Sequence, residues 1–341
     1  MLTKIIMLTI LLSMGLLVLI RDSKGKKNGF FDRDTTNCMR GFWCLVILLV
    51  HIPQEYQNSI QDMIGSFAYI GVTFFFMTSG YGLMMGIQKN GADSVKGFWL
   101  RRLPKIVLPM FIANIIISFA NFAQKGSYDF SDLINVNGFV RQLIIFYFIF
   151  WLVFRVLPQS ILLVHKTIMI CLCVMAVSLV SYFLKFNAWP TESFGFIYGI
   201  LLSQYKTKFE KFADNKWLVK CAGFCLTSAV IGIAYIKIKH IAFIGDYIVK
   251  ILLGLSILMF ILLLNFRIPV GNAVSRFLGK ISYEVYLLHI AAFAILTALP
   301  VNIDSGLYVL FSIIITVVLS VIVNFVQSRL LRLLAIQREK N

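Results

Sequence analysis

Two histidines lie inside apolar stretches of this sequence and are the first candidates for chemistry. His51 ends the run that begins at Arg40, and His289 lies in a second apolar stretch. An ionisable group is expensive inside such a stretch and is therefore a functional candidate. A neutral imidazole accepts a proton near neutral pH, which suits a general base. The other two histidines, His165 and His240, lie in or beside expected loops, where we expect them to be solvated.

Arg40 precedes His51 by eleven residues, and this spacing predicts that both side chains share one face of a helix. Eleven residues return to within about 20° of the starting direction and rise about 16 Å. If Arg40 lies at one membrane surface, His51 lies about halfway through the bilayer, on the path of a long ligand held by its phosphate at Arg40. The alternative is a snorkelling arginine and a histidine that bonds to a neighbouring helix.

A small-residue stretch and a basic cluster follow along the chain. Ser79 precedes Gly80 in an apolar stretch, and small residues there let helices approach closely. Arg101, Arg102 and Lys105 lie within about one turn at a predicted helix start. Such a cluster suits phosphate groups, although the preference of basic residues for cytoplasmic loops would also place it there.

Hydroxyl, aromatic and acidic side chains complete the candidates. Ser282 and Tyr286 stand seven and three residues before His289, so we expect their hydroxyls at helical spacing from its ring. A structural histidine bonded to them is the alternative to a catalytic one. On a predicted outer loop, Trp189 could stack on a sugar and Glu192 could accept hydrogen bonds from hydroxyls. Alternatively, they are an aromatic-belt tryptophan and a helix-capping acid.

The composition places these residues in a membrane. The chain has 341 residues, 59% of them hydrophobic and 14% charged, and its mean hydropathy is +0.85. Soluble domains carry about a quarter charged residues, so an ordinary soluble enzyme is excluded. Apolar windows suited to membrane helices recur along the chain. We predict an all-α polytopic membrane bundle of about eleven transmembrane helices, at residues 4–20, 40–53, 66–87, 106–123, 139–157, 167–184, 193–205, 218–236, 247–264, 281–299 and 306–328.

Basic residues predict the orientation because Lys and Arg favour cytoplasmic loops. With the N-terminus outside and the C-terminus inside, 25 of the 32 basic residues lie in the cytoplasm and 7 on the other side. They form short clusters between apolar segments, so the net charge of +17 indicates topology in the cell membrane and not a nucleic-acid partner. The six cysteines form no CxxC pair and no cluster with histidine at metal spacing, so we expect no metal site.

Four motifs in order resemble the acyltransferase 3 family of multi-pass membrane acyltransferases. They are Arg-x10-His at 40–51, Phe-Phe-x-x-Ser-Gly-Tyr at 75–81, Arg-Arg-Leu-Pro-Lys-Ile-x-x-Pro at 101–109 and Leu-Gly-Lys-Ile-Ser-Tyr-x-x-Tyr-Leu-x-His at 278–289. The resemblance covers about residues 34–330. It implies a ten-helix core with both ends inside, preceded at 1–33 by an extra N-terminal helix and a basic loop and followed at 331–341 by a short basic tail.

The resemblance also implies an activity. Members of this family typically move an acyl group, often acetyl from acetyl-CoA, to hydroxyls of extracytoplasmic carbohydrates or lipid-linked glycans. On the matching motifs, acyl-CoA would be held by basic residues, and His51 would act as general base, with His289 as a second candidate. An acyl-His51 or acyl-Ser79 relay is the variant mechanism. The residues expected to hold acyl-CoA are Arg40, Arg101, Arg102 and Lys105.

Two departures from the family pattern modify this expectation. Lys105 stands where the pattern has an arginine, and a lysine does not make the bidentate phosphate contact of an arginine. We also see no appended soluble acyl-transfer domain, so we expect a stand-alone transferase. The competing class is a polytopic transporter or glycan-export protein, in which Arg40 and His51 would line a path without acyl-transfer chemistry. Release of CoA in proteoliposomes separates the two classes.

Overall fold

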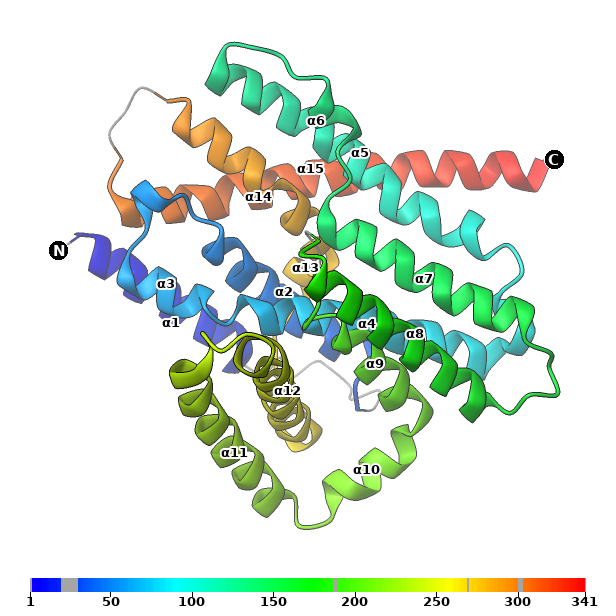
Figure 1. The fold of residues 1–341 in the computed structure, drawn as a ribbon. Coiled ribbons are helices and arrows are strands. Elements are labelled where there is room, and N and C mark those ends of the chain that lie inside the picture. Colours follow the sequence, from blue (N-terminus) through cyan, green and yellow to red (C-terminus); the bar gives the residue numbers. More distant parts are fainter. Residues whose placement is uncertain (1, 20–29, 187–188, 269, 300–302, 341) are drawn as a thin grey trace.

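The described part of the chain is helical and contains no strand. The computed structural model describes residues 2–19, 30–186, 189–268, 270–299 and 303–340 (Figure 1). Its elements are α1 (Leu2–Leu19), α2 (Arg33–Val50), η1 (Gln54–Tyr56), α3 (Ser59–Gly65), α4 (Ala68–Asn90), η2 (Gly91–Ser94), α5 (Phe98–Lys125), α6 (Ser131–Ile134), α7 (Gly138–Val156), α8 (Leu163–Phe183), α9 (Phe194–Gln204), α10 (Lys206–Asp214), α11 (Trp217–Ile238), the π-helical turn η3 (Ile244–Val249), α12 (Lys250–Arg267), α13 (Ala273–Lys280), α14 (Ser282–Thr297) and α15 (Ser305–Lys340).

The predicted all-α polytopic membrane bundle is confirmed, and each predicted window falls on a helix. Among the described residues, seven helices are long and apolar enough to cross a membrane, or eight if the bent pair α13 and α14 forms one span. By length and composition, fewer helices than the predicted eleven can cross the membrane. One reason is α9, whose 11 residues extend only about 16 Å. Another is α2, which carries Arg33, Asp34 and Arg40.

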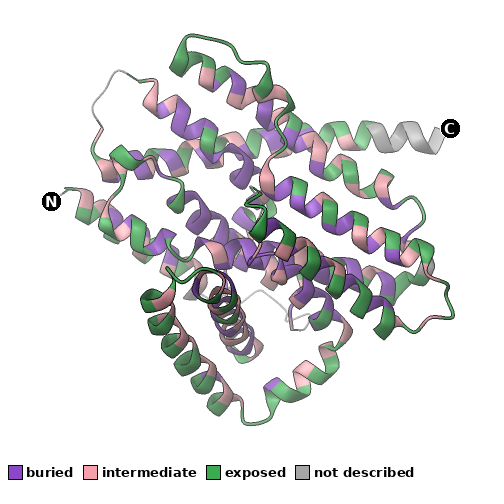
Figure 2. Ribbon diagram, in the orientation of Figure 1, coloured by how far each residue is buried: buried purple, intermediate pink, exposed green. Residues whose placement is uncertain are grey.

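Helix α2 lies in the buried part of the bundle and packs against α4, α13 and α14. Figure 2 shows buried residues concentrated on these helices, whereas α11 at the edge is almost wholly exposed. Exposed apolar helices of a membrane bundle face the lipid, so the burial pattern places α2 inside and α11 outside. We call the end of the bundle at which α2 begins the arginine side, and the end at which α2 ends the histidine side.

Glycines allow α13 to lie directly on α2. A Cβ atom on Gly279 would collide with the carbonyl oxygen of Asn37, and a Cβ atom on Gly41 would collide with that of Ser275. Such contacts between backbones are available only to glycine, as at other close helix crossings in membranes. The helical direction then changes by 74° at Ile281, between α13 and α14. This packing explains why the motif at 278–289 begins with Leu-Gly.

The structure also shows where the motifs at 75–81 and 101–109 lie. Gly80 packs against the backbone of Phe196 in α9, which confirms the packing interpretation of the Ser-Gly motif. The motif at 101–109 lies inside α5, which begins at Phe98 and continues through Pro104 and Pro109. The predicted start at residue 106 was therefore wrong by about two turns, because charged residues at the helix start lowered the hydropathy of the window.

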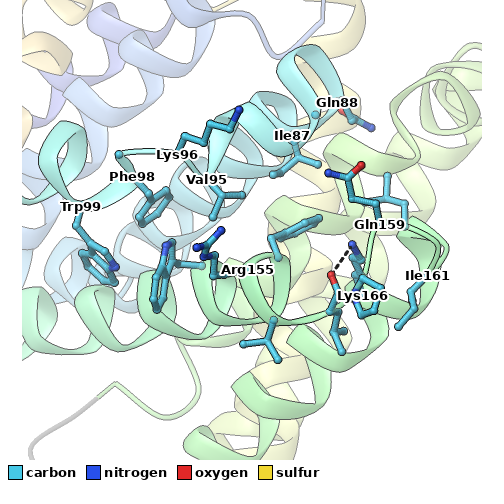
Figure 3. A pocket seen from close by; sticks show the side chains of 18 of the residues that line it. Ile87, Gln88, Val95, Lys96, Phe98, Trp99, Arg155, Gln159, Ile161 and Lys166 are labelled. Carbon is cyan, nitrogen blue, oxygen red and sulfur yellow. Dashed lines mark hydrogen bonds between the residues drawn. The ribbon is translucent and has the colours of Figure 1, made fainter.

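Two cavities open at the arginine side. One has a volume of about 1100 Å³ and lies between the end of α4, the start of α5, the end of α7 and the start of α8 (Figure 3). The other has a volume of about 530 Å³ and is lined by α4, η2, α5 and Phe150 of α7. Phe98 lines both cavities and stands between them.

Candidate active site

His51 and His289 meet in space. Their ring centroids are 4.8 Å apart at an interplanar angle of 45°. His51 is the C-terminal cap of α2 and is exposed, while His289 lies in α14 and is 2% exposed. Helix α2 ends at Val50, so His51 caps the helix instead of lying inside it as the window 40–53 predicted, and protein side chains do not cover its ring. Its depth in the bilayer stays a prediction. The two histidines together form a pair with one accessible and one buried ring.

The backbone sets the protonation pattern of the His51 ring. Its Nδ1 lies 2.8 Å from the carbonyl oxygen of Ile47. A carbonyl oxygen only accepts hydrogen bonds, so Nδ1 carries the proton and donates it. In the neutral ring Nε2 is then left with a free lone pair. This arrangement suits a general base whose Nε2 accepts a proton from a substrate hydroxyl.

His289 lacks the hydroxyl partners that its spacing predicted. The Ser282 hydroxyl donates to the carbonyl oxygen of Gly279 at 2.8 Å, and the Tyr286 hydroxyl donates to Oδ1 of Asn137 at 2.8 Å. Neither ring nitrogen of His289 has a hydrogen-bond partner in the part of the chain that the structure describes. The prediction was wrong because each hydroxyl finds a nearer acceptor, and the buried ring remains free to interact with His51 or a ligand.

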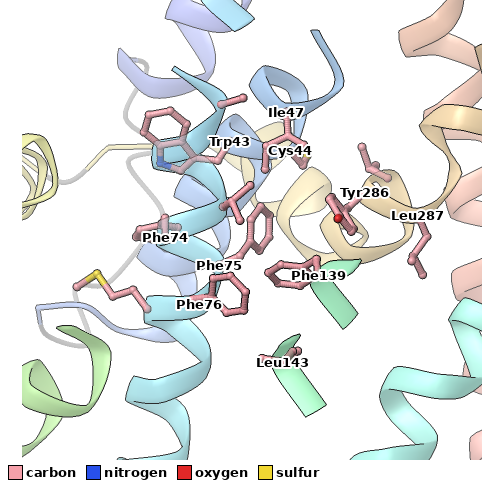
Figure 4. Close-up of a cluster of buried hydrophobic side chains, with 14 of the residues drawn as sticks. Trp43, Cys44, Ile47, Phe74, Phe75, Phe76, Phe139, Leu143, Tyr286 and Leu287 are labelled. Carbon is pink, nitrogen blue, oxygen red and sulfur yellow. The ribbon is translucent and has the colours of Figure 1, made fainter. Parts of the chain in front are cut away.

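An aromatic seam leads from the histidine pair toward Arg40. We define the seam as the residues lining a cavity of about 10 Å³ among α2, α4, α7 and α14: Ile47, Val72, Phe75, Phe139, Tyr283 and Tyr286. Ring centroids of Phe139 and Tyr286 are 5.1 Å apart, and those of Tyr286 and His289 are 6.0 Å apart. Figure 4 shows Phe75 next to Phe139, with Tyr286 nearby; the Phe75 and Phe139 rings meet edge to face, with centroids 6.4 Å apart at an interplanar angle of 76°. The free space holds about one water molecule, so the seam is closed in this structure.

Arg40 stands at the other end of the seam. Its guanidinium carbon lies 5.3 Å from the centroid of the Phe75 ring, and its Nε is buried without a hydrogen-bond partner among the described residues. Residues 40, 44, 47 and 51 follow one face of α2, as the eleven-residue spacing predicted. An arginine with an unpaired buried N–H is placed to bind an anion, because a buried donor without an acceptor is costly.

Glu284 is a part of the site that the sequence analysis did not single out. It is 2% exposed, and its Oε1 accepts hydrogen bonds from the side-chain amides of Asn324 and Gln327 in α15. Its Oε2 has no hydrogen-bond partner in the described part of the chain, and the carboxylate interacts electrostatically with Arg40. An acidic residue inside an apolar span was the signal that could have identified it. This interaction favours the positive charge of Arg40, whose side chain is half-buried.

The basic cluster is divided by the structure. Arg101 and Arg102 line the cavity of about 530 Å³, whereas Lys105 is exposed and does not line it. Arg101 already donates to the carbonyl oxygen of Ser94 at 2.9 Å. Arg102 makes no hydrogen bond or ion pair with the described residues and is the cation of this cavity available for a phosphate.

Ser79 is not brought to the histidine pair. Gly71 of α4 packs against Ile47 of α2, one turn below His51. Ser79 follows Gly71 by eight residues, which places it about 12 Å further toward the arginine side. A direct handover between His51 and Ser79 therefore has no geometric support, and the role of Ser79 stays a prediction.

Glu192 is held inside the protein near the start of α9. It is 2% exposed and forms an ion pair of 2.7 Å with Nζ of Lys250, while its other oxygen accepts a hydrogen bond of 2.8 Å from the Thr191 hydroxyl. Both oxygens are thus occupied before any ligand binds. Trp189 is half-buried against the apolar core. The predicted contact of these two residues with a sugar stays a prediction, and the ion pair gives Glu192 a structural role.

No cluster that could hold a metal is found in the described residues, where no group of three His, Cys, Asp or Glu side chains is close enough. The fold and the site together define a polytopic membrane protein in which an aromatic seam connects a histidine pair to a half-buried arginine. The family model described as an acyltransferase domain, that of the acyltransferase 3 family, matches residues 34–325. The chain belongs to this family and is a membrane acyltransferase. No curated protein and no solved structure matches the chain.

Proposed function

We propose that this acyltransferase uses acyl-CoA from the arginine side and acylates a hydroxyl at the histidine side. The proposed acyl group is acetyl, and the proposed acceptor is an extracytoplasmic carbohydrate or lipid-linked glycan. The observation that carries the proposal is the single face of α2 that bears Arg40 at one end of the aromatic seam and His51 at the other. A donor held by its phosphates at Arg40 and Arg102 would extend its long arm about 16 Å to His51.

In this mechanism His51 first accepts a proton and then donates it. Its Nε2 takes the proton from the acceptor hydroxyl while the oxygen attacks the thioester carbonyl carbon. The carbon–sulfur bond breaks, and the imidazolium returns the proton to the CoA sulfur, giving an ester and free CoA. His289 is a positioning residue in this proposal, since it contacts the His51 ring and lies behind it.

The closed seam adds a requirement for the donor. A space of about 10 Å³ does not admit the arm of acyl-CoA, so the rings of Phe75, Phe139 or Tyr286 have to rotate when it binds. Tyr286 is held by Asn137, whereas Phe75 and Phe139 have no such anchor. Donor binding would therefore open the seam between α4 and α7.

The test is release of CoA from acetyl-CoA by the purified protein in proteoliposomes, with a carbohydrate acceptor extract inside. We expect His51→Gln to lower the rate by about 10² to 10⁴, because it removes the general base. His240→Gln, which changes an exposed histidine far along the chain, serves as the matched control and should keep the wild-type rate. Absence of CoA release by the wild type, or near-normal release by His51→Gln, would contradict the proposal.

A further inference from the structure

The cavity of about 1100 Å³ at the arginine side has no part in the proposed acyl transfer. It is lined by the ends of α4 and α7 and the starts of α5 and α8, and neither histidine of the pair nor Arg40 lines it. Among the described residues, the lining includes three basic side chains and no acidic one: Lys96, Arg155 and Lys166. Figure 3 shows Arg155 near Val95 and Lys166 further along the lining, near Gln159. The cavity is therefore positively charged.

Lys166 is the most unusual of these side chains because it is buried. It is 6% exposed, and its Nζ makes one hydrogen bond of 3.3 Å, to the carbonyl oxygen of Leu157. The ring of Phe154 lies 5.6 Å from the same Nζ. A buried ammonium normally has an anionic partner, because leaving water is costly for an unpaired charge. The described residues supply none here.

Arg155 offers a second cation to the same space. It lies in the last turn of α7 and makes no hydrogen bond or ion pair with the described residues. Lys96 is less available, because its Nζ is 2.7 Å from Oδ1 of Asp93. The first turn of α8, where Leu163 lines the cavity and no side chain caps the helix, adds a partial positive charge. An anion in the cavity would thus meet two unpaired cations and a helix N-terminus.

The rim of the cavity is apolar and faces outward from the bundle. Leu100 and Val156 line it and are 63% and 64% exposed. Trp99 and Trp151 stand beside them with ring centroids 6.1 Å apart. Exposed leucine and valine on membrane helices contact acyl chains, and tryptophan favours the headgroup level. A ligand with an anionic group and hydrocarbon chains matches both parts of the cavity.

We propose that this cavity binds the phosphate of an anionic phospholipid, with Lys166 and Arg155 as its ligands and the acyl chains along Leu100 and Val156. Basic pockets between membrane helices bind lipid headgroups by this chemistry. The proposal commits to a lipid because the cavity opens past exposed apolar side chains; the 530 Å³ cavity with Arg102 is the one assigned to the soluble donor.

The test is native mass spectrometry of the detergent-purified protein with added phosphatidylglycerol or phosphatidylcholine. We expect phosphatidylglycerol to remain bound at concentrations at which phosphatidylcholine does not. Arg155→Gln and Lys166→Met should each weaken phosphatidylglycerol binding about fivefold, the effect of one basic residue at an anionic headgroup. Lys211→Gln, an exposed cation of α10, is the matched control and should bind as the wild type does.

Competition separates a lipid from a soluble phosphate compound. Excess free CoA or inorganic phosphate should leave phosphatidylglycerol bound, and displacement by either would assign the cavity to a soluble ligand and overturn the proposal. Equal retention of the two lipids by the wild type would also overturn it, as would unchanged binding by Arg155→Gln. Because Arg155 is exposed, this variant tests the site even if Lys166→Met does not fold.

Discussion

At the scale of residues, the two histidines have different surroundings and should differ in their contribution to the reaction. His51 is accessible, and its proton position is set by the carbonyl oxygen of Ile47. His289 is buried and contacts that ring and the ring of Phe293, at 5.6 Å between centroids. Only His51 can meet an acceptor hydroxyl without a rearrangement. Substitutions can therefore separate the general base, His51, from the positioning residue, His289.

We expect His289→Phe to keep the ring contact with His51 and to lower kcat less than tenfold, with KM for the acceptor little changed. His51→Gln should lower kcat by about 10² to 10⁴. Steady-state kinetics in proteoliposomes, measured for both variants, gives the comparison. If His289→Phe is as inactive as His51→Gln, the buried histidine carries a proton in the reaction and the positioning role is wrong.

Arg40→Ala should weaken acyl-CoA binding by about tenfold or more, since a hydrogen bond to a charged group contributes about 1.5 to 3 kcal/mol. The aromatic ring of Phe75 would remain in place, so the bundle should stay assembled. Isothermal titration of the detergent-solubilised protein with a non-hydrolysable acyl-CoA measures the change. Lys211→Ala is the control of equal charge change, and donor affinity that is the same in all three proteins would exclude Arg40 as a ligand.

Glu284→Gln tests the charge balance around Arg40. The amide keeps the shape of the side chain next to Asn324 and Gln327 but removes the electrostatic interaction with the half-buried guanidinium of Arg40. We expect the free protein to lose about 1 to 3 kcal/mol of stability, the cost of a buried group left unsatisfied. A donor phosphate at Arg40 would restore part of it. Thermal unfolding with and without CoA measures both effects. If CoA raises the unfolding midpoint of Glu284→Gln no more than that of the wild type, Glu284 does not balance the charge of Arg40.

At the scale of elements, the site depends on how α13 brings α14 to α2. Gly279 permits the backbone contact with Asn37, and the 74° change of direction that follows carries His289 toward His51. We expect Gly279→Leu to cost about 1 to 3 kcal/mol or more through overpacking and to lower activity by displacing His289. Gly223→Leu in α11, where a Cβ atom meets nothing within 4 Å, is the control.

The midpoint of thermal unfolding and the monodisperse fraction on size exclusion provide the readout for these glycine variants. Equal midpoints for Gly279→Leu and Gly223→Leu would show that α13 does not need the close contact, and the account of the motif at 278–289 would then be wrong.

Hydropathy located the helices well and their ends poorly. The windows cannot register where the chain reverses, as it does after His51, where the side chain of Gln61 donates to the carbonyl oxygen of Leu49 and turns α3 back onto α2. The window 281–299 begins at the bend at Ile281, but hydropathy alone cannot give the 74° change of direction between α13 and α14. The shared face of Arg40 and His51, in contrast, was predictable because it depends on the geometry of a single helix.

The partners of the histidines were not predictable from one helix. The contact between His51 and His289 and the electrostatic interaction between Glu284 and Arg40 join segments more than 200 residues apart. Local spacing suggested Ser282 and Tyr286 as partners of His289, but Asn137, from another helix start, takes the Tyr286 hydroxyl. Hydrogen-bond partners in a bundle are set by tertiary packing, which a single sequence does not contain.

At the scale of the whole molecule, the orientation in the membrane decides whether cytosolic acyl-CoA can reach the proposed donor site. Acyl-CoA is a cytosolic compound, so the arginine side has to face the cytoplasm for Arg40 and Arg102 to meet it. The 25 to 7 distribution of basic residues predicts this orientation. Helix α5, with 28 residues and a length of about 42 Å, connects the two sides and offers a test within one element.

Single cysteines in a background without the native ones should therefore label from opposite sides. Lys96→Cys, just before α5, and Ser160→Cys, between α7 and α8, should react with a membrane-impermeant maleimide only after the cytoplasmic side is exposed. Ser127→Cys, just after α5, should react in intact cells, because this loop lies at the other end of the same helix. All three positions are exposed, so failure to react reflects the side of the membrane and not burial. Labelling of Lys96→Cys and Ser160→Cys from outside would place the buried arginine away from the cytosolic donor, and acyl transfer from CoA along α2 would then be excluded even if His51 proves essential.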